Sequence, residues 1–187
     1  LLDVPIEEIC IIKEQSEKFP NVSILTQPVR EYPYKSLGAH MLGRVGLISA
    51  EEYEKNSENG YTINSNIGKS GIEKWAEEYL RGIDGEITYY LNSKGDIISS
   101  EITKEPIAGK TVMMSIDKNL QKKTQESLKE KVKSLQKQGG TCKAGCAVAI
   151  DIDTGKVLAA ANYPTYDSAT MSQNYDKLQS DPAKPLV

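Results

Sequence analysis

Serine and lysine stand three residues apart at two places in this chain, Ser115 with Lys118 and Ser134 with Lys137. This spacing puts an amine one helical turn from a hydroxyl, where it can activate the serine as a nucleophile for acyl transfer. The chemistry needs the serine at the start of a helix and inside a cleft. Ser134 falls late in a helix rich in charge instead. We therefore interpret both matches as helix-surface or capping positions and predict no catalytic residue.

Three shorter matches to catalytic motifs are also better explained as structure. Ser57–Asn59 and Ser172–Asn174 fit Ser-x-Asn, and 69–71 resembles Lys-Thr-Gly, although its serine is better used as a helix cap. The segment 68–70 also resembles a phosphate-binding loop. That loop has a glycine five positions earlier, where this chain has Ile63. We exclude nucleotide binding on this ground.

The chain offers no set of residues suited to a metal ion or a cofactor. Cys142 and Cys146 are four residues apart, but a metal site would need two more ligands, and the only histidine, His40, is far away in sequence. We expect Cys142 to be a loop thiol and Cys146 a buried small apolar residue. A lone histidine is more often packed or hydrogen-bonded than catalytic, and we expect this of His40.

Composition indicates an ordinary globular protein. The 187 residues are 39% hydrophobic and 26% charged, which is too apolar for a disordered chain. The formal net charge of −3 gives no electrostatic reason to expect nucleic acid as a partner. No apolar run approaches the length of a membrane span.

The best-marked element is a predicted helix over 70–81. Ser70 and Glu73 have the spacing of a capping box, Arg81 lies in the last turn, and Gly82 can end the helix in the left-handed region. An apolar stripe at helical period supports the prediction, and it comprises Ile72, Trp75, Ala76, Tyr79 and Leu80.

Other helices and strands follow from the same rules, and the fold class they indicate is α+β. The further helices expected are 6–18 (with Ile6, Ile9 and Cys10 on its apolar side), 36–43, 49–55 with a second capping box, and 118–138 after the cap Asp117, with the stripe Leu120, Thr124, Leu128, Val132 and Leu135. The strands expected are 22–26, 86–92, 96–103, 111–116 (or an extended segment), 144–152 and 156–161.

A break at 105–109 divides the chain into two predicted domains. Residues 1–107 would form a mixed domain of short helices and hairpins. Residues 108–187 would place one long helix on two antiparallel strands of an incomplete sheet.

Four ordered segments resemble class B penicillin-binding proteins. Arg30-x-Tyr32-Pro33 with 38–46 resembles their second conserved block, 68–85 their third, 109–121 the start of their transpeptidase domain, and 145–167 its first two strands. The tail 181–186 resembles the segment that leads to their Asn-Arg-Ala. Within this family the chain looks most like the elongation-type proteins of Gram-positive bacteria. It departs at Lys35, where a glycine is common.

This resemblance implies a noncatalytic fragment of a serine-type peptidoglycan D,D-transpeptidase, the target of penicillin in cell-wall synthesis. The family's first block would precede Leu1, and its catalytic Ser-x-x-Lys would follow Val187. The parent would be anchored on the outer face of the cytoplasmic membrane, and residues 1–107 would be its dimerisation (pedestal) domain. The implied partners are a SEDS-family glycosyltransferase and a second copy in a homodimer.

The structural and interface residues implied by the resemblance are Arg30, Tyr32, Pro33, Gly43, Gly71, Glu73, Leu80, Arg81, Gly82 and Asp117. The second and third blocks of the family pack together. We therefore predict that Arg30 pairs with a carboxylate, for which Glu73 is the candidate.

The alternative is a stand-alone extracellular interaction module. The apolar strands 144–152 and 156–161 argue against it, because they have the composition of strands buried on both faces and little sequence is left to cover them. We expect an exposed apolar face, a free strand edge and self-association.

Overall fold

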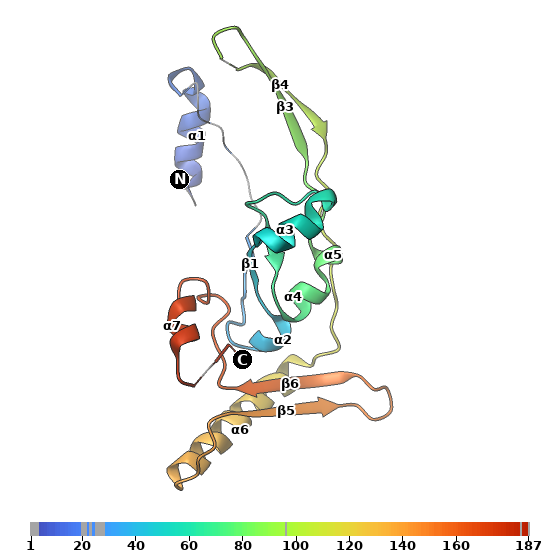
Figure 1. Ribbon diagram of the computed structural model, residues 1–187, viewed down its shortest axis with the longest axis vertical. Helices are drawn as coiled ribbons and strands as arrows, with labels where there is room; N and C mark the ends of the chain where they lie inside the picture. Colours follow the sequence, from blue (N-terminus) through green and yellow to red (C-terminus); the bar gives the residue numbers. More distant parts are fainter. Residues whose placement is uncertain are drawn as a thin grey trace. The chain divides into compact units, whose positions relative to one another are not determined.

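The computed structural model describes residues 4–19, 22, 24, 29–95, 97–183 and 185–186 (Figure 1). Its fold is α+β, as the sequence predicts, with mostly short helices and antiparallel two-stranded sheets. The chain forms two compact units. The first comprises 1–29 and 83–107, and the second comprises 30–82 and 108–187.

In the first unit, helix α1 (Ile6–Glu14) begins after Pro5 and gives way to a 3₁₀ turn over Ser16–Lys18. The predicted helix 6–18 is therefore shorter than expected. None of the residues of α1 is buried, and Ile6 is 71% exposed, so the expected apolar side makes no core here. Most of the predicted strand 22–26 lies outside the described residues.

The predicted hairpin of the first unit is confirmed. Strands β3 (Glu86–Leu91) and β4 (Ile97–Lys104) are antiparallel, and an isolated bridge between Ile83 and Ile107 closes the base of the hairpin. Every residue of β3 and β4 is exposed. The hairpin therefore presents both of its faces.

The second unit opens with short elements. These are α2 (Ala39–Leu42), β1 (Val45–Leu47), α3 (Ala50–Asn56), the 3₁₀ turn η2 (Ser57–Asn59), β2 (Asn66–Gly68), α4 (Gly71–Trp75) and α5 (Glu77–Leu80). Strands β1 and β2 are antiparallel. The predicted capping box of α3 is confirmed, since Ser49 Oγ accepts from the Glu52 amide at 3.3 Å and Glu52 accepts from the Ser49 amide at 2.8 Å. Lys35 adopts φ +53°, a left-handed conformation that explains why a glycine would suit this position.

The single helix predicted over 70–81 is wrong, because the chain breaks at Ala76 into α4 and α5. The capping box at its start is also absent. Gly71 takes φ +59°, which is not helical, and the Ser70 side chain makes no cap hydrogen bond. The break separates the expected apolar stripe. Ala76 is fully buried, whereas Trp75 is 74% exposed and Tyr79 is 49% exposed.

The second unit continues with α6 (Lys118–Lys137), β5 (Gly145–Ile150), β6 (Val157–Tyr163) and α7 (Tyr175–Ser180). The predicted cap of the long helix is confirmed, since Asp117 Oδ1 accepts from the Leu120 amide at 2.7 Å. Helix α6 packs on the antiparallel pair β5–β6 (Figure 1). Helix α7 was not predicted, because the tail showed only loop-like composition.

The segment 111–116 contains no strand, so the first of the two forms expected there is absent. Burial within this part corrects two expectations. On α6, Gln121 is buried, whereas the predicted stripe residue Leu120 is 38% exposed. Strand β5 alternates, with Cys146, Val148 and Ile150 exposed, so it is covered on one face only and Cys146 is not buried. The expected exposed apolar face is therefore present.

Among the described residues, no helix has the length and hydropathy needed to cross a membrane. The same residues contain no His, Cys, Asp and Glu cluster that could hold a metal ion.

Candidate functional site

The predicted ion pair between Arg30 and Glu73 is present in the second unit. Arg30 Nη2 donates to Glu73 Oε2 at 2.9 Å, and the two side chains are 45% and 13% exposed. Tyr32 lies nearby, and burial raises the pKa of its hydroxyl, with the Glu73 charge adding to the effect. An ion pair with one exposed partner contributes up to ~1 kcal/mol, so its main effect is to fix α4 against the segment around Arg30.

Gly43 and Gly71 lie where the end of α2 meets the start of α4. Gly43 has φ +82°, and a Cβ there would collide with the Ser70 carbonyl oxygen. Gly71 has φ +59°, and a Cβ there would meet the Met41 carbonyl oxygen. The structure thus brings together two of the glycines named from the sequence and gives each a packing reason.

Arg81 holds the loop before β2 rather than acting on the helix dipole alone. Its guanidinium donates to the carbonyls of Asn59 at 2.8 Å and Gly60 at 2.6 Å, and it lies 3.4 Å from the centre of the Tyr61 ring. Tyr61 in turn donates to Glu77 at 2.8 Å. Burial and this carboxylate raise the pKa of Tyr61 to about 12.

Sequence reasoning missed Tyr61 and Glu77, although both belong to this cluster. Glu77 also accepts from the Gly68 amide at 2.8 Å, so one carboxylate joins α5 to the loop and to β2. Gly82 has the left-handed conformation that the sequence predicts, and Leu80 lies close to Gly109. Gly82 takes φ +75°, and the carbonyl of Leu80 lies where a Cβ on Gly109 would fall.

Lys69, the lysine of the Lys-Ser-Gly match, forms an ion pair with Glu52 on α3. The hydrogen bond from Lys69, helped by the Ser49 amide, lowers the pKa of Glu52 to about 2. The lysine is therefore engaged in holding α3 to the start of α4.

The serines of the two serine–lysine matches are exposed. Ser115 is exposed and donates to the Val157 carbonyl at 2.7 Å, which ties the segment before α6 to β6. Ser134 is exposed near the end of α6. Both positions agree with the surface interpretation.

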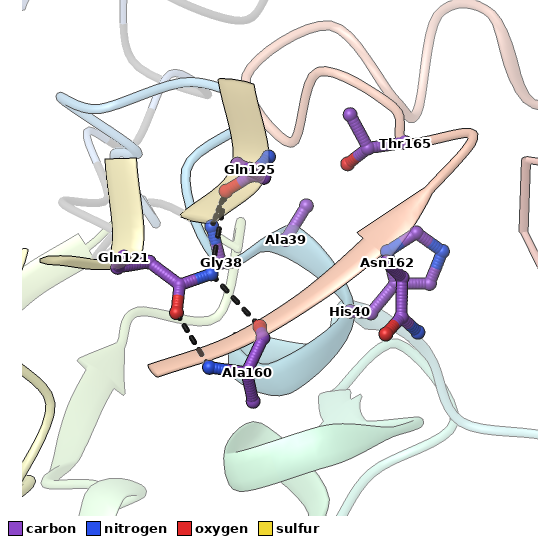
Figure 2. A pocket seen from close by; sticks show the side chains of 8 residues that line it. All are labelled: Gly38, Ala39, His40, Gln121, Gln125, Ala160, Asn162 and Thr165. Carbon is purple, nitrogen blue, oxygen red and sulfur yellow. Dashed lines mark hydrogen bonds between the residues drawn. The ribbon is translucent and has the colours of Figure 1, made fainter. Parts of the chain in front are cut away.

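Two glutamines of α6 form a junction with β6 and with the strip 36–38 (Figure 2). The Gln121 amide bonds both backbone groups of Ala160, at 2.7 and 2.8 Å. The Gln125 amide donates to the Ser36 carbonyl at 2.8 Å and accepts from the Gly38 amide at 3.1 Å. Sequence reasoning assigned no role to either side chain, although Gln121 ends the segment 109–121 that resembles the start of the transpeptidase domain.

His40 is packed and hydrogen-bonded, as expected. Its Nε2 lies 2.8 Å from the Pro185 carbonyl and so donates to it. Its ring meets the Tyr166 ring edge-on at 5.1 Å, and Tyr166 donates to the Ala39 carbonyl at 3.0 Å. Burial lowers the pKa of His40 below its usual range. These contacts attach the tail of the chain to α2.

Known proteins are similar to this chain in sequence and in architecture. Residues 1–114 match the family model of the penicillin-binding protein dimerisation domain. Over 178 residues the chain is 31% identical to the peptidoglycan D,D-transpeptidase MrdA of Acinetobacter baumannii. The match covers 92% of this chain and 25% of that protein. The chain therefore spans about a quarter of the length of the curated relatives it matches.

Two solved structures agree with this match. Penicillin-binding protein 2B of Streptococcus pneumoniae aligns with a TM-score of 0.64 at 30% identity, over 85% of this chain and 27% of that one. Penicillin-binding protein PBP2 of Helicobacter pylori, solved in complex with MreC, aligns with a TM-score of 0.57 at 28% identity, over 84% and 28%. More than half of the residues match the family model, so the chain belongs to the penicillin-binding protein dimerisation-domain family.

Proposed function

We propose that this chain is the scaffold and partner-binding region of a peptidoglycan D,D-transpeptidase on the outer face of the cytoplasmic membrane. In this proposal residues 1–107 are the dimerisation domain and 108–187 are the N-terminal part of the transpeptidase domain. The observation that carries it is the family match over residues 1–114, with D,D-transpeptidases among the homologues.

The role proposed is binding rather than catalysis. Ser115 donates to a backbone carbonyl and Ser134 lies on an exposed helix surface, so neither has the setting of an activated nucleophile. Arg30 pairs with Glu73 of α4, and the glycines at 43 and 71 allow the close approach of α2 and α4.

The β3–β4 hairpin is the surface we propose for the partner. Ile87 pairs with Ile102 and Tyr89 with Ser100, so these side chains share one face. Ile87 is 52%, Tyr89 48% and Ile102 57% exposed. Exposed apolar faces of this kind typically mark sites of protein interaction. The partner implied by the resemblance is a SEDS-family glycosyltransferase, and the PBP2–MreC complex supports protein binding by this fold.

Binding of the purified chain to the SEDS glycosyltransferase from the same organism, held in detergent, tests the proposal. Tyr89→Ser should weaken binding by about tenfold or more, because exposed aromatic residues are frequent hot spots. Tyr90→Ser is the matched control. Tyr90 is 49% exposed on the opposite face, where its hydroxyl donates to Glu101 at 3.2 Å.

The control variant should bind within about twofold of the wild type. Absence of binding by the wild-type chain, or equal losses in the two variants, would overturn the proposed surface. A parallel titration with an MreC homologue from the same organism shows whether that partner uses the same face.

A further inference from the structure

Gln121 occupies the place of a neighbouring strand at the edge of β6. Its side chain is 1% exposed, and its amide satisfies both the N–H and the C=O of Ala160. Ala160 is paired with Val148 of β5, and because both of its backbone groups bond Gln121 of α6, they point away from β5 to the outer edge of β6. A buried amide without these partners would cost about 1–3 kcal/mol.

Gln125, one turn further along α6, repeats the arrangement toward a different segment. Its Nε2 donates to the Ser36 carbonyl and its Oε1 accepts from the Gly38 amide. The strip 36–38 leads directly into α2. Helix α6 therefore binds β6 through Gln121 and the strip 36–38 through Gln125 (Figure 2).

The two amides are also bonded to each other. Gln121 Nε2 donates to Gln125 Oε1 at 3.3 Å. If the Gln125 amide were rotated by 180°, its Nε2 donor would face two other donors, the Gly38 N–H and Gln121 Nε2. If the Gln121 amide were rotated in the same way, its Nε2 would face the Ala160 N–H and its Oε1 would face the Ala160 carbonyl. Only one orientation of each amide satisfies all the partners, so each side chain restricts the other.

We propose that Gln121 and Gln125 are coupled positioning residues that fix where the strip 36–38 lies relative to β6. A displacement of the strip is then passed to β6 through the hydrogen bond between the two side-chain amides. The functional meaning rests on the proposed function, in which the strip belongs to the dimerisation domain and β6 to the transpeptidase domain. A partner that moves the first would move the second through these two side chains.

Amide hydrogen exchange of the full 187-residue chain, resolved by NMR, tests the coupling. The decisive variant is Gln125→Met, which keeps the length of the side chain and removes its amide. The decisive probe is the Ala160 amide, which Gln125 does not bond. Exchange at the Val132 amide within α6 serves as the reference for global opening.

Gln125→Met should speed exchange at Gly38 by about fivefold or more relative to Val132, because Gly38 loses its hydrogen bond. It should also speed exchange at Ala160 relative to Val132, because Gln121 loses the acceptor that orients its amide. Gln121→Met should speed the same two amides, since coupling is reciprocal. Gln125→Glu keeps the acceptor for Gly38 and Gln121, so it should stay closer to the wild type than Gln125→Met.

Gln136→Met is the matched control on the same helix. The Gln136 side chain donates to the Cys142 carbonyl at 2.8 Å, outside the junction of Gln121 and Gln125, and its loss should leave both amides unchanged. Faster exchange at Gly38 alone in Gln125→Met shows two independent bonds and overturns the proposal, and this variant decides even if Gln121→Met does not fold. The glycosyltransferase binding assay is separate, so either result can fail without the other.

Discussion

The glycine at position 43 is required by a close approach of two backbones as well as by its left-handed conformation. Its φ is +82°, and the Ser70 carbonyl occupies the position of a Cβ. Gly155 has a similar φ of +70°, but a Cβ there would have nothing within 4 Å. The pair separates the cost of conformation from the cost of the contact.

Gly43→Ala should lower the free energy of unfolding by about 3 kcal/mol or more, because the left-handed conformation and the collision both oppose it. Gly155→Ala should cost only about 1–2 kcal/mol, the conformational part. Urea unfolding of the two variants measures the difference. Equal losses would show that α2 and α4 can separate without penalty.

The Glu52–Lys69 ion pair makes stability depend on pH. The pKa of Glu52 is lowered from 4.5 to about 2 in the folded chain, so the stabilisation is fully present above pH 4.5 and is lost as the pH falls toward 2. Because the Glu52 side chain is 35% exposed, solvent screening limits the contribution to about 1 kcal/mol.

Lys69→Met should therefore be less stable than the wild type at pH 6, and the gap should shrink as the pH falls from about 5 to about 2. Urea unfolding at several pH values measures it. A gap that does not change with pH would show that Lys69 acts through packing of its chain alone.

At the scale of elements, the outer edge of β6 is hydrogen-bonded to other segments, whereas one face of β5 is exposed. Asp117 and Gln121 bond the outer edge of β6 at Leu158 and Ala160. On β5, Val148 is 60% and Ile150 is 55% exposed. An apolar strand face of this kind favours association with another copy of the chain.

Val148→Lys should reduce self-association, because a charge on that face opposes a second copy. Ile63→Lys, at a residue of the second unit that is 70% exposed, is the matched control and should leave association unchanged. Sedimentation velocity over a range of concentrations reports the result. A wild-type chain that stays monomeric throughout would remove the homodimer from this account.

Local signals predicted the elements that depend on neighbours in sequence. The caps at Ser49 and Asp117 and the β3–β4 hairpin follow from residues within a few positions of each other. The capping box predicted at Ser70 is absent because that end of α4 meets other segments: the close approach to Gly43 fits a left-handed Gly71, and Arg30 engages Glu73. Rules that use only neighbouring residues cannot predict contacts with Gly43 and Arg30, which are remote in sequence.

Some contacts of the candidate site could be predicted from the sequence and others could not. The Arg30–Glu73 pair was predictable from the resemblance, since it joins two recognised blocks. The Tyr61–Glu77 contact and the glutamine junction were not, because each joins segments whose approach only the folded chain shows. A buried polar side chain such as Gln121 has no periodicity signal that separates it from a solvated one.

At the scale of the whole molecule, the two compact units divide the work that we propose. The first presents an exposed hairpin, and the second joins α2, α4 and α6 by short polar contacts. In the proposed scaffold, the hairpin is the accessible surface, and the polar contacts hold the elements of the second unit together. Neither requires a nucleophile in residues 1–187.

Intact-mass spectrometry of the purified chain after incubation with benzylpenicillin tests this most directly, because a transpeptidase serine forms a stable acyl adduct. The account predicts an unchanged mass, with the glycosyltransferase still bound by the treated chain. A mass increased by one penicillin and mapped to Ser115, Ser134 or any other serine of this chain would contradict it.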